Sequence, residues 1–253
     1  MKKLIALIMT VLTAVCCCFA FTACGSKGTL QVYTNAGFAP FEYVNQQGKV
    51  VGVDIDVMNA IGKELGYKVV INDIEFDNIL NEVSKNELAV GAAGMSQKPE
   101  RDEVALASIV YATSQQYVIA PVGTFEENAI VSVEDIAVAV GEKKIGVQRG
   151  TTGADLVEAD YESITIEYSN AVIASTDIGS TLGAVVIDEL PAKEISGANT
   201  NLACWQIDAE MESYVLYFNL NATELVSKVN EVLGKLIENG TIAQFIVNHS
   251  SGN

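Results

Sequence analysis

The feature that most constrains the fold is an alternation of short apolar segments with segments of helical periodicity. Residues 30–34 and 88–93 are apolar and extended in character, and between them Ile55, Met58 and Ile61 recur at helical spacing before Gly66. Such alternation favours parallel sheets with helices on both faces. It restarts after the polar residues 123–135 and continues to about residue 215. Two α/β units therefore predict two lobes with a cleft between them.

The order of segments also predicts how the lobes are connected. Residues 224–238 carry an apolar face at helical spacing, which predicts a C-terminal helix that returns to the first unit. We therefore assign residues 29–120 and 216–253 to lobe 1 and residues 121–215 to lobe 2, with crossings near Ala120–Pro121 and Tyr214–Val215. Within lobe 1, Asp54 is expected to cap the helix that Gly66 ends.

The first residues have the features of an export signal. A basic start is followed by an uncharged run over residues 4–21, and small residues then precede Cys24 and a Gly/Ser linker. This stretch resembles the bacterial lipobox, which predicts a signal peptide over residues 1–23, a lipid on Cys24 and a linker over 24–28. An uncleaved membrane anchor is the alternative. Both interpretations place the remaining chain on the extracytoplasmic face of the cell membrane.

Composition excludes several other functions. The net charge of −17, from 15 basic and 32 acidic residues, argues against nucleic acid as a partner. Of the five cysteines, all but Cys204 lie at or before Cys24, so no disulfide and no cysteine metal site are expected. The one histidine, His249, lies near the end of the chain, so neither a histidine-based catalytic triad nor a histidine metal site is expected.

The most informative local stretch covers residues 94–101. It follows the apolar run 88–93, and Pro99 stands where a helix can begin, which places Arg101 in the first helical turn. A cation there opposes the helix dipole, so it is better explained if a carboxylate ligand is bound as a bidentate pair. The alternative is a surface arginine paired with a neighbouring acid such as Glu100 or Glu103.

Other candidate side chains lie where strands of these units end. Residues 148–153 link a strand to a helix and contain two glycines and two threonines, which suits either an anion at the helix start or a plain threonine cap. Asp188 ends an apolar strand before Pro191, so it is either a cap or a carboxylate for a ligand ammonium. Phe38 and Phe76 either flank a ligand or belong to the core.

Together these residues suit a zwitterion. Arg101 would come from one unit and Asp188 from the other, and a free amino acid carries one group of each sign. Burying either charge without a partner would cost several kcal/mol, so a site for an amino acid needs one fixed partner for each. Because the partners are divided between the lobes, closure would depend on the ligand.

Five segments carry a resemblance to a known family: residues 34–42, 52–56, 94–101, 146–153 and 186–191. In this order they resemble the extracellular solute-binding protein family 3, the polar amino-acid-binding proteins of ABC importers, over nearly all of residues 29–248. The resemblance implies an α/β periplasmic-binding-protein fold of type II, with two lobes joined by a two-crossing hinge. It also implies a protein that binds a free L-amino acid and delivers it to a membrane permease, without a cofactor. A monomer is expected.

The resemblance also implies roles for individual residues. The family's ligand-binding positions fall on Asn35, Phe38, Phe76, Gly94, Ser96, Arg101, Thr151, Thr152 and Asp188. Arg101 matches the arginine that binds the α-carboxylate, with help from the glycine, the serine and a threonine. Asp188 matches the carboxylate that takes the α-ammonium. Phe38 and Phe76 match the positions that flank the ligand side chain, and Asn35 matches a position that reads it.

Three positions refine this picture. Lys98 stands where the family usually has threonine, which alters the rim of the arginine loop. Asn35 is neutral where binders of basic amino acids tend to carry aspartate, which favours a neutral or polar ligand. Gln115 matches a glutamine that is frequent in the family near the crossing between lobes.

Two alternative functions are open at this stage. An enzyme on the same fold would need an acid/base pair, for which Glu42 or Asp77 are the candidates. A sensory ligand-binding domain would need an output segment, which we do not expect in this chain. We therefore expect a binding protein rather than an enzyme.

Overall fold

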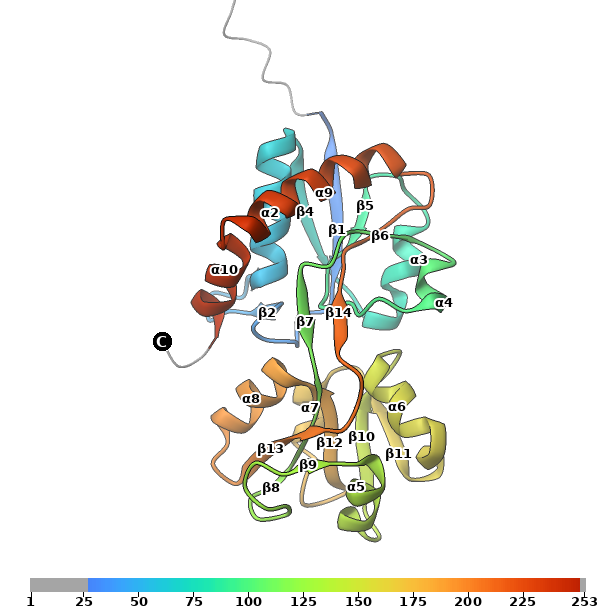
Figure 1. Cartoon of the computed structure of the whole chain (residues 1–253), viewed down its shortest axis with the longest axis vertical. Helices are drawn as coiled ribbons and strands as arrows, with labels where there is room; N and C mark the ends of the chain where they lie inside the picture. Colours follow the sequence, from blue (N-terminus) through green and yellow to red (C-terminus); the bar gives the residue numbers. More distant parts are fainter. Residues whose placement is uncertain (1–26, 251–253) are drawn as a thin grey trace, which may run out of the picture.

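The computed structural model describes residues 27–250 and consists of two α/β lobes stacked along one axis (Figure 1). The type II two-lobed fold is confirmed. The signal peptide expected over residues 1–23 and the lipidation site at Cys24 lie outside the described residues. Within residues 27–250, no helix is both long and apolar enough to cross a membrane.

The first lobe is built on a five-stranded mixed sheet. Its strand order is β4 (Lys68–Asp73), β1 (Thr29–Thr34), β5 (Ala89–Gly91), β15 (Tyr217–Phe218) and β6 (Leu106–Ala107). The strands β4, β1 and β5 are parallel, whereas β15 is antiparallel to both of its neighbours. The surrounding elements are α2 (Val53–Leu65), η1 (Phe76–Asn78), α3 (Ile79–Val83), α4 (Pro99–Asp102), α9 (Thr223–Glu238), α10 (Thr241–His249) and the hairpin of β2 (Tyr43–Val44) and β3 (Val50–Val51). Two apolar clusters fill the core of this lobe. One contains buried residues of α2 and α9, and the other contains buried residues of α3.

The second lobe is built on a six-stranded mixed sheet. Its order is β11 (Thr165–Tyr168), β10 (Lys144–Gln148), β12 (Leu182–Asp188), β8 (Gln116–Pro121), β13 (Leu202–Ile207) and β9 (Ile130–Val131). The helical elements of this lobe are α5 (Val133–Val140), α6 (Thr152–Tyr161), η2 (Glu162–Ile164), α7 (Ala171–Ser175) and α8 (Glu189–Ala198). Buried residues of α5 and α6 form one apolar cluster, and those of α7 and α8 belong to another. Cys204 is a free, half-buried residue of β13.

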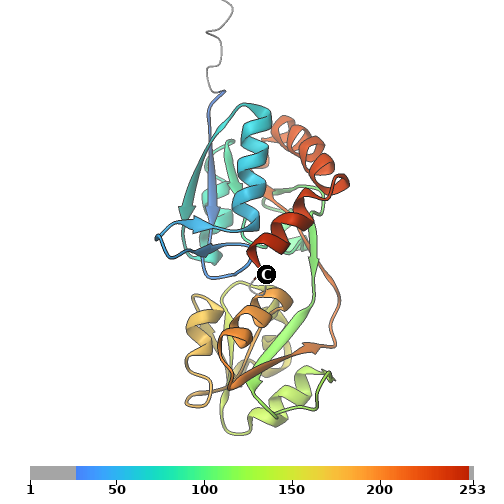
Figure 2. The same cartoon turned by 90° about the vertical axis from the view of Figure 1, so that its left-hand side faces the viewer.

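Two antiparallel strands, β7 (Ala112–Ser114) and β14 (Glu212–Tyr214), join the lobes along one side of the molecule (Figures 1 and 2). The crossing expected near Ala120–Pro121 is therefore wrong. β8, which contains those residues, lies between β12 and β13 in the second sheet. Its apolar sequence could not distinguish the last strand of one unit from a central strand of the next. The return crossing is β14 itself, which ends at Tyr214, close to the expected crossing at Tyr214–Val215. The next strand, β15, already belongs to the first sheet.

The helix α2 shows which local signals held and which did not. Ile55, Met58 and Ile61 are buried, as their spacing predicted, and Gly66 ends the helix in the left-handed conformation. Asp54 is not the cap that the sequence favoured, because α2 begins at Val53 and makes no side-chain cap bond. The Asp54 side chain is fully buried and accepts a hydrogen bond from the Gly94 N–H, in the loop that follows β5.

Two segments contain elements that were not predicted from the sequence: residues 123–135 and the C-terminal segment after α9. The irregular stretch at residues 123–135 contains β9 and the start of α5, whose Ser132 and Asp135 form a reciprocal capping box. The predicted C-terminal helix is confirmed as α9, and a further helix, α10, follows it across α2. Both helices cover the first lobe (Figure 2).

Candidate functional site

The carboxyl ends of parallel strands from both lobes converge on one small cavity. It is lined by Phe38, Glu42, Phe76, Ala93, Gly94, Ser96, Arg101, Gln148, Thr151, Thr152 and Asp188. All of the expected binding residues except Asn35 are in this set. The cavity has a volume of ≈ 10 Å³, about the room of one water molecule, so the lobes are closed on each other. A larger ligand needs them to separate.

Arg101 is a buried cation in the short helix α4, which begins at Pro99 as expected. Its guanidinium donates to the Ser96 carbonyl at 2.6 Å and to the Gly150 carbonyl, from the second lobe, at 3.0 Å. The ring of Phe76 lies 5.3 Å from the guanidinium carbon. Burial lowers the pKa of Arg101, but a guanidinium stays charged in proteins.

No carboxylate in the described part of the chain forms an ion pair with Arg101, and only 5% of the residue is exposed. The surface ion pair with Glu100 or Glu103 is therefore not formed. A guanidinium has five N–H donors, and two bonds to carbonyl oxygens leave donors for an incoming carboxylate. This end of the cavity is suited to bind an anion.

Asp188 is a buried acid on the opposite lobe, at the end of β12. It occupies the cap position of α8 but makes no side-chain cap bond. Instead its carboxylate accepts a hydrogen bond from the Tyr214 hydroxyl at 2.7 Å. Burial, followed by the charge of Glu212, raises the pKa of Asp188 to about 8. A cation placed beside Asp188 would relieve both effects.

Glu42 is a third titratable group of the cavity, and from sequence it was a candidate only for the acid/base pair of an enzyme. It follows the loop of Phe38, and only 1% of the residue is exposed. Both of its carboxylate oxygens are buried without a hydrogen-bond partner in the described structure. Burial, and then the charges of Asp54 and Asp188, raise its pKa. An acid placed directly after the apolar residues 38–41 was the available signal.

The loop after β5 is held in place by the buried carboxylate of Asp54. The Gly94 N–H donates to the buried Asp54 carboxylate at 2.9 Å, and the Tyr111 hydroxyl donates to the same carboxylate at 2.6 Å. Gly94 has a positive φ of 52°, and a Cβ there would lie 2.5 Å from the Phe38 ring. The loop therefore requires glycine at this position. Burial raises the pKa of Asp54 to about 6.

The loop at residues 148–153 delivers a helix N-terminus to the cavity. Thr151 caps α6 by accepting from Ala154 N at 3.2 Å, and it donates its hydroxyl proton to the Gln148 carbonyl at 2.8 Å. Its side chain is thus the plain cap that the sequence left open. Thr152 begins α6 and lines the cavity. The positive end of the helix dipole at this point favours a ligand carboxylate.

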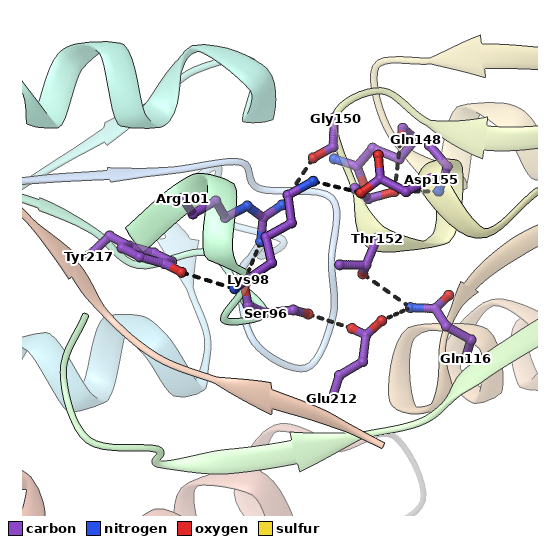
Figure 3. A network of polar contacts seen from close by, with 12 residues as sticks. Ser96, Lys98, Arg101, Gln116, Gln148, Gly150, Thr152, Asp155, Glu212 and Tyr217 are labelled. Carbon is purple, nitrogen blue, oxygen red and sulfur yellow. Dashed lines mark hydrogen bonds and ion pairs between the residues drawn. The ribbon is translucent and has the colours of Figure 1, made fainter. Parts of the chain in front are cut away.

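Direct bonds between the lobes hold the closed arrangement. The Gln148 amide donates to Asn35 Oδ1 at 3.0 Å, and Asn35 Nδ2 donates to the Ile74 carbonyl at 2.7 Å. Asn35 is therefore engaged in a contact between lobes and does not line the cavity. Lys98 forms an ion pair with Asp155 of α6 at 2.6 Å, again across the cleft (Figure 3).

A second network crosses between the lobes next to the hinge strand β14 (Figure 3). Glu212 accepts hydrogen bonds from the Ser96 hydroxyl and, at 3.0 Å, from the Gln116 amide. Gln116 lies 3.5 Å from the Thr152 hydroxyl. The glutamine that bridges here is thus Gln116, whereas Gln115 bonds to α8 through its backbone carbonyl. No local sequence pattern pointed to Glu212, because its position depends on the pairing of β14 with β7.

Comparison with known proteins gives consistent matches. A family model described as bacterial extracellular solute-binding proteins, family 3, matches residues 30–249. The chain is 27% identical over 250 residues to the arginine-binding extracellular protein ArtP of Bacillus subtilis (strain 168), covering 92% of this chain and 94% of ArtP.

Solved structures resemble the chain across both of its lobes. The amino acid ABC transporter substrate-binding protein AbpA from Streptococcus pneumoniae, bound to L-arginine, matches with a TM-score of 0.80 at 28% identity, over 88% of this chain and 94% of AbpA. The ancestral amino acid-binding protein AncCDT-1, a precursor of cyclohexadienyl dehydratase, matches with a TM-score of 0.75 at 25% identity, over 89% of this chain and 96% of that protein.

Proposed function

The chain belongs to the bacterial extracellular solute-binding proteins of family 3, and from that premise we propose that its ligand is a free amino acid with a cationic side chain, L-arginine in particular. Its role is that of the substrate-binding component of an amino-acid ABC importer. In the proposed cycle the open lobes take up the amino acid, close around it and present it to the membrane permease.

The observation that carries this proposal is the charge content of the closed cavity. One buried cation, Arg101, and two buried carboxyl groups, Asp188 and Glu42, line the same cavity. The carboxylate and ammonium of any amino acid account for Arg101 and Asp188. Glu42 then remains without a partner, and a buried carboxylate that accepts no hydrogen bonds needs a nearby cation to stabilise its charged form. A ligand with one extra positive charge satisfies all three groups.

Glu42 favours arginine over lysine. Both of its oxygens are without partners, and a guanidinium can donate to two carboxylate oxygens at once, whereas an ammonium acts as a point charge. Phe38 and Phe76 also line the cavity and offer apolar surface for the side-chain methylenes. ArtP is described as arginine-binding and AbpA was solved with L-arginine, which supports the same ligand class here.

The neutral Asn35, which favoured a neutral ligand from sequence alone, does not argue against this proposal. Its amide is already bonded to Ile74 and Gln148, so it is not available to select the ligand in the closed form. Selection by charge is instead assigned to Glu42, seven residues further along the same loop.

A screen of the twenty amino acids by thermal unfolding tests the ligand. A ligand that binds only the folded protein raises the melting temperature by mass action, and we expect L-arginine to give the largest rise. Titration calorimetry with L-arginine then gives the affinity. Stabilisation by neutral or acidic amino acids alone would contradict a cationic ligand, and no stabilisation by any of the twenty would contradict amino-acid binding.

The substitution Glu42→Gln is expected to change the selectivity of the site. The amide keeps the shape but cannot neutralise a guanidinium, so affinity for L-arginine should fall by about 10- to 100-fold. Affinity for L-glutamine should not fall, because its side chain carries no charge. Calorimetry with both ligands measures the ratio, with the exposed Glu75→Gln as the matched control. An equal loss for both ligands would show that Glu42 does not read the side chain.

We propose binding without turnover. The likeness to AncCDT-1 raises a dehydratase as the second candidate, although that protein is itself described as amino acid-binding. His249, the one histidine, bonds to Asp56 and Tyr43 on the outside of lobe 1 and does not line the cavity. Incubation with cyclohexadienyl carboxylic acids, followed by absorbance of an aromatic product, tests the alternative. Product above the uncatalysed rate would favour it.

The proposed location is the extracytoplasmic face of the cell membrane, through a lipid on Cys24. The sequence motif supports this part of the proposal. We expect the mature chain to begin at a lipid-modified Cys24, and Cys24→Ser to abolish this modification, because the lipid is attached through the Cys24 thiol. Mass spectrometry of the mature N-terminus and fractionation measure this, with Cys204→Ser as the control. A wild-type chain that keeps residues 1–23 and carries an unmodified Cys24 would favour the uncleaved anchor.

A further inference from the structure

Glu212 occupies an unusual place, because it lies on a strand that joins the lobes and bonds to both of them. Its strand, β14, pairs with β7 between the two sheets. One carboxylate oxygen accepts from Ser96 of the first lobe, and the other accepts from Gln116 of the second lobe (Figure 3). Neither Ser96 nor Gln116 is appreciably exposed. Glu212 therefore fixes the orientation of groups on both sides of the cleft.

The bond to Ser96 has a direct chemical consequence. A serine hydroxyl carries one proton, and here that proton is donated to Glu212. The Ser96 oxygen can then act towards the cavity only as an acceptor. Its neighbouring carbonyl already holds the Arg101 guanidinium at 2.6 Å. Glu212 thus presents the Ser96 oxygen to a ligand group that donates hydrogen bonds.

The Asp188 carboxyl group lies beside this acceptor. Its pKa is raised by burial and then by the charge of Glu212, so the two carboxyl groups repel each other when both are ionised. The other charged or titratable groups near them are Arg101, Glu42 and Tyr214. Within residues 27–250 no lysine or arginine forms an ion pair with Asp188 or Glu212. A cation with several N–H donors beside Asp188 would stabilise both carboxyl groups in their charged form.

We propose that Glu212 is a positioning residue for the ligand's α-ammonium: it makes Ser96 an acceptor and adds a second negative charge behind Asp188. This inference rests on the proposed function, since it names the group of the amino acid that is recognised. Because Glu212 bonds to Ser96 of the first lobe and to Gln116 of the second in the closed structure, it links recognition of the α-ammonium to closure. Ligands without that ammonium gain nothing from Glu212.

The test compares two ligands on two proteins. The probes are L-arginine and 5-guanidinopentanoic acid, which is arginine without its α-amino group. A glutamine at position 212 has one acceptor and one donor end, so it cannot accept from both Ser96 and Gln116. We expect Glu212→Gln to lower the affinity for L-arginine by about tenfold or more and the affinity for the analogue by less than about threefold. Competition calorimetry measures both.

Glu210→Gln is the matched control, since Glu210 is an exposed acid two residues away that does not line the cavity. It should change neither affinity. Equal losses of both ligands in Glu212→Gln would show a merely structural role and overturn the inference, as would unchanged affinity for L-arginine. If the wild-type protein binds no amino acid, the proposed function fails instead.

A second variant covers the case in which Glu212→Gln does not fold. Ser96→Ala removes the acceptor itself, so it should show the same selective loss for L-arginine. If both variants fold, Glu212→Gln should reduce the affinity for L-arginine less in the Ser96→Ala background than in the wild-type protein. The two side chains act through the same hydrogen bond, so their effects should not add. A Ser96→Ala protein that loses both ligands equally would overturn the inference.

Discussion

Replacing Arg101 with alanine is expected to weaken binding of L-arginine by about a thousandfold or more. Arg101 is buried, and its guanidinium has no carboxylate partner within the described chain, so the ligand carboxylate is its proposed counter-ion. Removing one member of a buried ion pair typically costs 3–5 kcal/mol, because the other charge is left unpaired. With about 1.4 kcal/mol for each factor of ten, this corresponds to loss of measurable binding for a micromolar site.

Arg149→Ala is the matched control for this substitution. Arg149 lies on the loop that faces Arg101, but its side chain is exposed and pairs with Glu167 at 3.1 Å on the outside of lobe 2. Exposed ion pairs contribute little, so its removal should change affinity by less than about threefold. Calorimetry measures both variants, and thermal unfolding without ligand establishes that they fold. Near wild-type affinity in a folded Arg101→Ala protein would remove the basis of the site.

The sequence predicted the elements whose signal is local. The spacing of Ile55, Met58 and Ile61 predicted α2, and Pro99 predicted the start of α4 with Arg101 in its first turn. The two-lobed architecture followed from the repeated alternation. Each of these inferences depends on residues within one or two turns of each other, where steric and packing preferences act directly.

Inferences that required pairing between distant strands were less complete. The place of the first crossing depended on β8 entering the second sheet, which is decided by its pairing with β12 and β13. The same limit applies to Glu212, whose partners Ser96 and Gln116 are each about one hundred residues away. No local pattern encodes such contacts.

Buried acids were the other source of error, because a side chain at a strand or helix end has several uses. Asp54 and Asp188 both occupy places where a cap is ordinary, yet neither caps its helix. Asp54 holds the Gly94 loop, whereas Asp188 faces the cavity. Glu42 gave the weakest signal although it is almost fully buried. The burial of each carboxyl group and the donors that surround it, which the sequence does not display, distinguish these roles.

Asp188→Asn is expected to reduce the affinity for L-arginine by about a thousandfold near pH 8. As with Arg101→Ala, one member of a buried ion pair would be removed. Here the buried charge left without its partner would be the ligand's α-ammonium. The carboxyl group also gives binding a pH dependence. Its pKa is about 8 in the closed cavity without an adjacent cation, and an ammonium would lower it. Below pH 8, binding therefore requires loss of a proton, so affinity should rise from pH 5 to pH 8 in the wild-type protein and not in the variant.

The stability of the unliganded protein should have the opposite pH dependence. The pKa of Asp188 is raised from an ordinary value of 3.8, so between about pH 4 and pH 8 the folded state holds a proton that the unfolded chain releases. The free energy of unfolding therefore falls as pH rises through this range, and Glu42 and Asp54 act in the same direction. Melting temperatures without ligand should be higher at pH 5 than at pH 8, with a smaller difference in Asp188→Asn. The exposed Asp208→Asn is the control, and an unchanged difference in Asp188→Asn would mean that this carboxyl group is not the one that titrates.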